Sequence, residues 1–120
     1  MTLPAPIRRE SAEHYAWGQG CSGWHLARSP AASVIEERIP PGACEGVHLH
    51  RRAWQFFYVL EGVATFERDG GRLALRPHEG IEVGAGVPHA IRNDAHADLR
   101  FLVVSVPPSH GDRVPAKSEP

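Results

Sequence analysis

Turn-forming residues divide this chain into short segments, and this punctuation limits the folds that it can adopt. The 120 residues include 11 Pro and 12 Gly, which argues against a fold built on long helices. Between the turns lie short runs rich in β-branched and aromatic residues, at intervals of roughly 8 to 12 residues. Such runs predict an all-β sandwich or barrel. The predicted strands are residues 24–27, 33–39, 48–50, 55–60, 63–68, 73–75, 81–83 and 99–106.

The length of the chain suits one domain with a single core. We expect the barrel to occupy residues 33–106. Residues 1–32 should form a lead with one short strand, in which residues 11–18 show weak helical spacing until Gly18 interrupts it. Residues 107–120 are rich in Pro and have little apolar surface to bury. Their composition predicts either a surface-lying tail or an arm packed on a neighbouring subunit.

The charge and the hydrophobic pattern exclude several classes of partner. A formal net charge of −1 gives no reason to expect nucleic-acid binding. No apolar run approaches the roughly 18 residues needed to cross a bilayer, and the N-terminus lacks the hydrophobic segment of a signal peptide. The two cysteines, Cys21 and Cys44, form no CxxC motif and are expected to be reduced thiols. These features predict a cytoplasmic protein with neither a membrane nor a nucleic-acid partner.

Two histidines, His48 and His50, stand two residues apart in a segment that has no helical periodicity. On a strand this spacing turns both imidazoles to the same face. A divalent metal needs several lone pairs that converge at about 2.0 to 2.2 Å, and this pair would supply two of them. The short loop of residues 51–54 lets the next strand begin beside the first, so Gln55 would also approach the site. A histidine pair alone, however, is more often only a polar surface feature.

The surrounding residues extend this pattern. The spacing Gly42-x5-His48-x-His50-x4-Gln55-x6-Gly62 resembles the first motif of the cupin superfamily, in which the Gln position usually holds Glu. This resemblance implies a cupin jelly-roll β-barrel, also called a double-stranded β-helix.

A second segment, residues 86–93, resembles the second cupin motif. It departs from the usual pattern at Gly84, where Pro is usual, and at His78, where Gly is usual; both changes affect turns more than metal ligation. The resemblance implies one divalent transition metal (Zn, Ni, Fe or Mn). Gln55 either ligates this metal through its amide oxygen or hydrogen-bonds a metal-bound water. The implied ligand set is His48, His50, Gln55 and His89.

A neutral ligand set has a chemical consequence. With Gln55 in place of Glu, the metal keeps its full +2 charge, which favours Lewis-acid catalysis. We therefore expect an isomerase, cyclase or lyase that acts on a small molecule. Similar ligand sets belong to small cupins acting on unsaturated uronates and to some polyketide cyclases. Two alternatives stay open: a metal-dependent dioxygenase, and a non-enzymatic module that senses a ligand or a metal.

Glu37 is the candidate for proton transfer. It shares one strand face with Ile35 and Ile39; if this apolar face is the inner one, Glu37 lies in the barrel, and otherwise it faces solvent. Burial would raise the pKa of its carboxyl group and suit it to move a proton. The expected substrate pocket is apolar and favours a small aromatic, enol or hydroxylated ligand. Its expected lining residues are Phe57, Val59, Phe101, Val103 and Ser105, with Val103 standing where the uronate-converting cupins carry an acid.

The opposite face of the strand at residues 55–60 carries Phe56, Tyr58 and Leu60. An apolar row of this kind on the outside of a barrel favours association. The sequence therefore predicts a homodimer.

Overall fold

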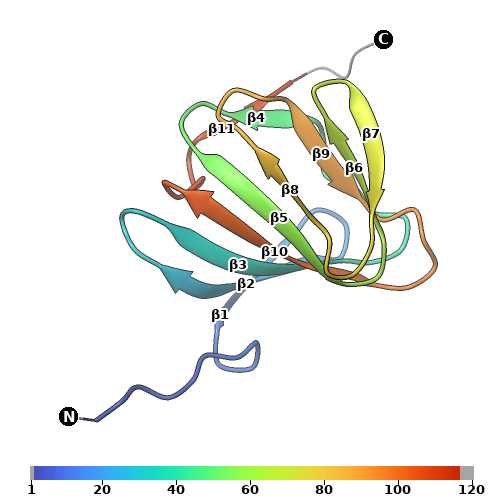
Figure 1. Cartoon of the computed structure of the whole chain (residues 1–120). Helices are drawn as coiled ribbons and strands as arrows, with labels where there is room; N and C mark the ends of the chain where they lie inside the picture. Colours follow the sequence, from blue (N-terminus) through green and yellow to red (C-terminus); the bar gives the residue numbers. More distant parts are fainter. Residues whose placement is uncertain (1, 117–120) are drawn as a thin grey trace.

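The computed structural model describes residues 2–116, and within them the chain forms two antiparallel sheets (Figure 1). The six-stranded sheet has the order β1-β2-β3-β10-β5-β8, and the five-stranded sheet has the order β11-β4-β9-β6-β7. This arrangement confirms the predicted all-β jelly-roll barrel. No helix in the described part of the chain is long and apolar enough to cross a membrane. The strands are β1 (Glu13–Trp17), β2 (Cys21–Arg28), β3 (Ser33–Ile39), β4 (His48–His50), β5 (Trp54–Glu61), β6 (Ala64–Arg68), β7 (Gly71–Leu75), β8 (Gly80–Val83), β9 (His89–Arg92), β10 (Leu99–Val106) and β11 (Arg113–Pro115).

Period-2 alternation positions the core between the two sheets. In β5, Gln55, Phe57 and Val59 are buried while the residues between them are half-buried, as expected for a strand with one inner face. Burial of apolar side chains from both sheets supplies the main stabilisation of the barrel. The largest fully buried apolar side chains are Phe66, Phe101, Ile39, Ile91 and Leu99.

The N-terminal lead contains two full strands rather than the single short one expected. Residues 13–17, which have weak helical spacing in the sequence, form β1 and pair with β2 from Glu13↔His25 to Trp17↔Cys21. Pairing with β2 overrides the local helical preference, because strand formation depends strongly on neighbouring strands. The lead therefore extends the six-stranded sheet and adds residues to its inner face.

The C-terminal segment adds an edge strand to the barrel, and all of its residues from 106 to 116 except Asp112 are exposed or half-buried at the surface. Strand β11 pairs with β4 at the edge of the five-stranded sheet, where Pro115 is tolerated because an edge strand has unpaired positions. The buried Asp112 carboxylate accepts hydrogen bonds from the backbone N–H groups of Arg51, Arg52 and Ala53 at 3.1, 2.9 and 3.0 Å. Residues 117–120 lie outside the described part of the chain.

The outer face of β5 is less exposed than the sequence suggests. Phe56, Tyr58 and Leu60 are all half-buried, and the rings of Phe56 and Tyr58 stack with centroids 6.1 Å apart. The exposed apolar side chains nearby are Trp54 and Val106. Association into a homodimer stays a prediction.

A buried asparagine at the end of β9 holds together three segments of the barrel. The Nδ2 group of Asn93 donates to the carbonyl oxygens of Ile39 and Ala97 at 2.9 and 2.8 Å, and its Oδ1 accepts from the N–H of Ala95 at 3.0 Å. Its backbone N–H also donates to the carbonyl of Ala43 at 3.0 Å. Asn93 thus connects the end of β9 to the turn that leads into β4.

We predict that Asn93→Ala destabilises the protein by about 2–4 kcal/mol, because two buried carbonyls and one N–H lose their partners. Urea unfolding monitored by circular dichroism measures this change. The matched control is His96→Ala in the same loop, an exposed position where the change should stay within about 0.5 kcal/mol. Equal stabilities of the two variants would contradict this role of Asn93.

Candidate metal centre

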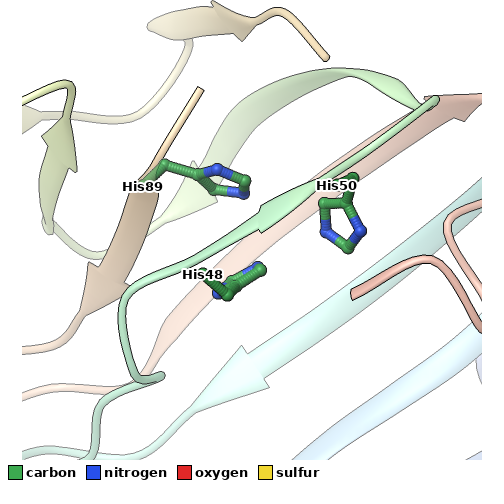
Figure 2. Close-up of side chains that lie close together, drawn as sticks. All are labelled: His48, His50 and His89. Carbon is green, nitrogen blue, oxygen red and sulfur yellow. The ribbon is translucent and has the colours of Figure 1, made fainter. Parts of the chain in front are cut away.

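Three histidines meet between β4 and β9. The register pairs His48 directly with His89, and His50 shares the same face of β4, as the spacing predicts. The ring centroids are 4.4 Å apart for His48 and His89, 5.1 Å for His48 and His50, and 5.6 Å for His50 and His89. Figure 2 shows the three rings around a common space, and one ligand atom from each lies within 4.8 Å of the others.

Hydrogen bonds to the backbone fix the tautomers of two of these rings. Because a carbonyl oxygen can only accept, Nδ1 of His48 donates to Gly46 at 2.8 Å and Nδ1 of His89 donates to Val87 at 2.9 Å. In both rings the Nε2 lone pair is then available as a ligand. Burial lowers the pKa of His48 to about 3 and that of His89 to about 4, and burial also lowers the pKa of His50. The imidazoles are therefore neutral at physiological pH, as metal ligation requires.

Gln55, on β5 of the other sheet, lines the same cavity as His48 and His50. Its Nε2 donates to Oγ of Ser105 at 3.0 Å, which leaves Oε1 buried without a hydrogen-bond partner among the described residues. Nε2 of His89 and Nδ1 of His50 are likewise buried and unpaired. Buried polar atoms without partners are costly, and three in one site indicate a missing ligand. Imidazole nitrogens with one amide oxygen suit a first-row divalent metal.

The site opens into a cavity of about 500 Å³. Its walls are more polar than the sequence predicts. The lining residues are Tyr15, Trp17, Gly18, Ile35, Glu37, Cys44, Glu45, Gly46, His48, His50, Gln55, Phe57, Val103, Ser109, His110, Gly111 and Arg113.

Of the residues expected to line the pocket, the structure places only Phe57 and Val103 in the cavity wall. Val59 and Phe101 are fully buried in the apolar core, and Ser105 holds Gln55 from behind. The cavity is less apolar than expected, because the lead and the C-terminal segment add polar side chains such as Tyr15, His110 and Arg113 to a barrel whose own strands are largely apolar.

Glu37 lies in the cavity wall, in line with Gly23 and Tyr15 on the two strands beside it. Gly23 of β2 pairs with Tyr15 of β1 on one side and with Glu37 of β3 on the other. Since Gly23 has no side chain, the Tyr15 ring lies over it; a Cβ at this position would collide with the ring. The Tyr15 hydroxyl donates to Oε2 of Glu37 at 3.3 Å.

Burial raises the pKa of Glu37 to about 8, with a further contribution from the charge of Glu45, while the hydrogen bond from Tyr15 opposes the shift. The same burial, together with the charge and hydrogen bonding of Glu37, raises the pKa of Tyr15. The Glu37 carboxyl group is therefore predominantly protonated at neutral pH.

Sequence reasoning missed three further residues at the cavity. Glu45 lies with Oε1 3.7 Å from Nε2 of His48, and burial raises its pKa to about 7; its position three residues before His48 was the available signal. His110 and Arg113 line the cavity from the C-terminal segment. Nothing local in the sequence marks either of them, because only the pairing of β11 with β4 brings them to the site.

We predict that the protein binds about one equivalent of a first-row divalent metal. His50→Ala should weaken the affinity more than about a hundredfold, since even the loss of a group that only supports a ligand costs 10- to 100-fold. Gln55→Glu should retain or tighten binding, because it places a charged oxygen at the same point. Elemental analysis and competitive metal titration measure these effects. The exposed His78 provides the control: His78→Ala should bind as the wild type does, and equal affinities of the His50 and His78 variants would refute the site.

We predict that the metal-free protein loses stability as the pH rises from about 7.5 to 9. In this window an imidazole with the ordinary pKa of about 6.5 is largely neutral in the unfolded chain, and the three site histidines, whose pKa values are lowered, are neutral in the folded protein. Glu45, whose pKa is raised only to about 7, has released most of its proton by then. Glu37 has an ordinary pKa of 4.5 and a folded value of about 8, so the folded state holds a proton that the unfolded state has released, and stability falls with increasing pH. Glu37→Gln should flatten this decline. Urea unfolding across the pH range tests it, and an unchanged slope in the variant would show that Glu37 is not the source.

Comparisons with known proteins agree with this architecture. Residues 35–105 match the model of the Cupin domain. An oxalate-binding protein of Thermotoga maritima is 29% identical over 69 residues, which are 58% of this chain and 57% of that protein, so the match spans little more than half of its length.

Two solved structures share the fold. The polyketide cyclase RemF from Streptomyces resistomycificus has 18% identity and a TM-score of 0.83, covering 98% of this chain and 88% of that one. A sugar phosphate isomerase of the cupin superfamily from Silicibacter pomeroyi has 25% identity and a TM-score of 0.71, covering 83% and 74%. With the three-histidine cluster on β4 and β9 and a family match over most of the barrel, this chain belongs to the cupin family.

Proposed function

We propose that this cupin is a metal-dependent enzyme that moves a proton on a small oxygenated substrate, as an isomerase, cyclase or lyase does. The observation that carries this proposal is the placement of a carboxyl group, Glu37, in the same cavity as the three histidines and the unpaired oxygen of Gln55.

The histidines and Gln55 would hold the metal and leave coordination positions open toward the cavity. A divalent metal bound there supplies Lewis-acid polarisation of a substrate carbonyl or enol oxygen. The protein residues keep this centre rigid: the carbonyls of Gly46 and Val87 orient two of the rings, and Ser105 orients the Gln55 amide. A site held in this way needs little reorganisation during a reaction.

Glu37 would carry the proton. Its Oε2 accepts the hydrogen bond from Tyr15, which leaves Oε1 as the oxygen available to exchange a proton with a substrate. A carboxyl group with a pKa of about 8 is protonated in its resting form and still ionises readily near neutral pH, which is the condition for efficient general acid–base catalysis. Tyr15 stabilises the carboxylate after the proton leaves.

The structural neighbours support this class of reaction without specifying it. One is a polyketide cyclase and another is a sugar phosphate isomerase, and we extend to this chain only the feature that such reactions share, which is proton movement beside a polarised oxygen.

A non-enzymatic ligand-binding module is the second candidate. It is favoured by the relative from Thermotoga maritima, which is an oxalate-binding protein. The two candidates differ in one property: an enzyme exchanges protons with its ligand, whereas a binding module retains the ligand unchanged.

We predict that metal-loaded protein in D2O catalyses exchange of the carbon-bound protons next to the carbonyl in hydroxyacetone, dihydroxyacetone or pyruvate, measured by proton NMR. Glu37→Gln should reduce this exchange by about 10²- to 10⁴-fold, because the proton carrier is lost. Its metal content, measured on the same samples, should not change.

Glu36→Gln is the matched control, since Glu36 is the adjacent residue on the opposite face of β3, where it pairs with Arg9 and Arg100 at 3.4 and 3.5 Å. This control should exchange protons at the wild-type rate. Equal rates in the Glu36 and Glu37 variants would remove Glu37 from the mechanism, and ligand retention without exchange would identify the binding module.

A further inference from the structure

Arg113 is the cationic side chain in the wall of the metal cavity. Strand β11 pairs with β4 so that Arg113 stands opposite His50, and residues directly opposite each other in an antiparallel pair project to the same face of the sheet. The guanidinium group thus extends from the position next to a metal-ligating histidine into the cavity.

The backbone that carries Arg113 is held on both sides. Asp112 accepts three backbone hydrogen bonds from residues 51–53, the loop between His50 and Gln55. On the other side, the N–H of Ala116 donates to the carbonyl of Val47 at 3.0 Å. Arg113 is therefore fixed relative to the metal ligands at its backbone, and such preorganisation reduces the entropic cost of binding a ligand.

The charge of Arg113 is not neutralised by the protein. Among the described residues it takes part in none of the ion pairs. Its positive charge lowers the pKa of the half-buried Glu45 carboxyl somewhat, against the larger effect of desolvation, yet the two groups form no ion pair. Arg113 is the one Lys or Arg side chain in the described wall of the cavity, and a guanidinium without an ion-pair partner favours an anionic ligand group.

We propose that Arg113 binds the carboxylate of the substrate and that the substrate is a small 2-oxo or 2-hydroxy carboxylate. This inference rests on the proposed function, in which the metal would polarise the substrate oxygen on the carbon next to the carboxylate. The adjacency of Arg113 and His50 in the register suits a substrate whose carboxylate lies close to the oxygen that the metal would hold, as on neighbouring carbons. A planar guanidinium suits a carboxylate, since it donates two parallel hydrogen bonds.

Arg113 lies outside residues 35–105, the part of the chain that matches the Cupin domain. The metal ligands lie inside that part, whereas this substrate contact comes from the C-terminal segment. Arg113 would therefore determine which ligands this chain selects without altering how it holds the metal.

The test compares pyruvate with methyl pyruvate, which has the same 2-oxo group but no negative charge, by calorimetric titration of zinc-loaded protein. We expect the wild type to bind pyruvate at least about tenfold more tightly than the ester. Arg113→Gln should lose this preference while its affinity for methyl pyruvate stays the same. Arg113→Lys, which keeps the charge but not the paired hydrogen bonds, should fall between them. Arg52→Gln is the control for removal of a nearby exposed charge outside the cavity lining, and should behave as the wild type.

Equal affinities of the wild type for the two compounds, or no binding of pyruvate at millimolar concentration, would overturn the proposal, as would an unchanged preference in Arg113→Gln. Zinc content is measured on every sample. A protein that takes up neither zinc nor another first-row divalent metal contradicts the proposed metal-dependent function, and a preference for pyruvate that depends on Arg113 in such a sample would still support the carboxylate contact. A zinc-loaded protein without the preference contradicts the carboxylate contact alone.

Discussion

The position of the metal site depends on how the three-residue strand β4 is held between two neighbours. Strand β9 places His89 opposite His48, and β11 places Arg113 opposite His50. A strand this short makes few hydrogen bonds of its own, so its register depends on these neighbours. Two further contacts hold its ends: Asp112 accepts hydrogen bonds from the loop after β4, and Asn93 donates to Ala43 in the turn before it. A shift of one residue would turn both histidines of β4 out of the cavity.

Local features of the sequence predict the barrel and the convergence of the three histidines well, because both follow from short-range geometry. Alternation in β5 separates the inner Gln55 from the outer Phe56, and the two-residue spacing of His48 and His50 determines that their rings share a face. The turn signals between strands limit the fold to an antiparallel arrangement. These rules need no knowledge of which strands become neighbours.

The cavity wall was poorly predicted because it depends on contacts between residues that are far apart in the sequence. Tyr15 reaches Glu37 across 22 residues of sequence, and Asp112 reaches the loop after β4 across 59 to 61. Both contacts depend on pairings at the two ends of the chain, where weak helical spacing or many prolines conceal the strands. Val59 and Phe101 face inward as expected, but other side chains separate them from the cavity, and strand periodicity cannot determine depth within a barrel.

The bare position at Gly23 bears on how such a protein could change during evolution. Tyr15 reaches Glu37 because the strand between them presents no side chain, so a side chain at Gly23 would displace the Tyr15 ring from Glu37. One mutation in a strand that contributes no reactive group would then alter the acidity of Glu37. Substitution at Gly23 is therefore constrained by the contacts of the cavity wall as well as by the packing of the sheet.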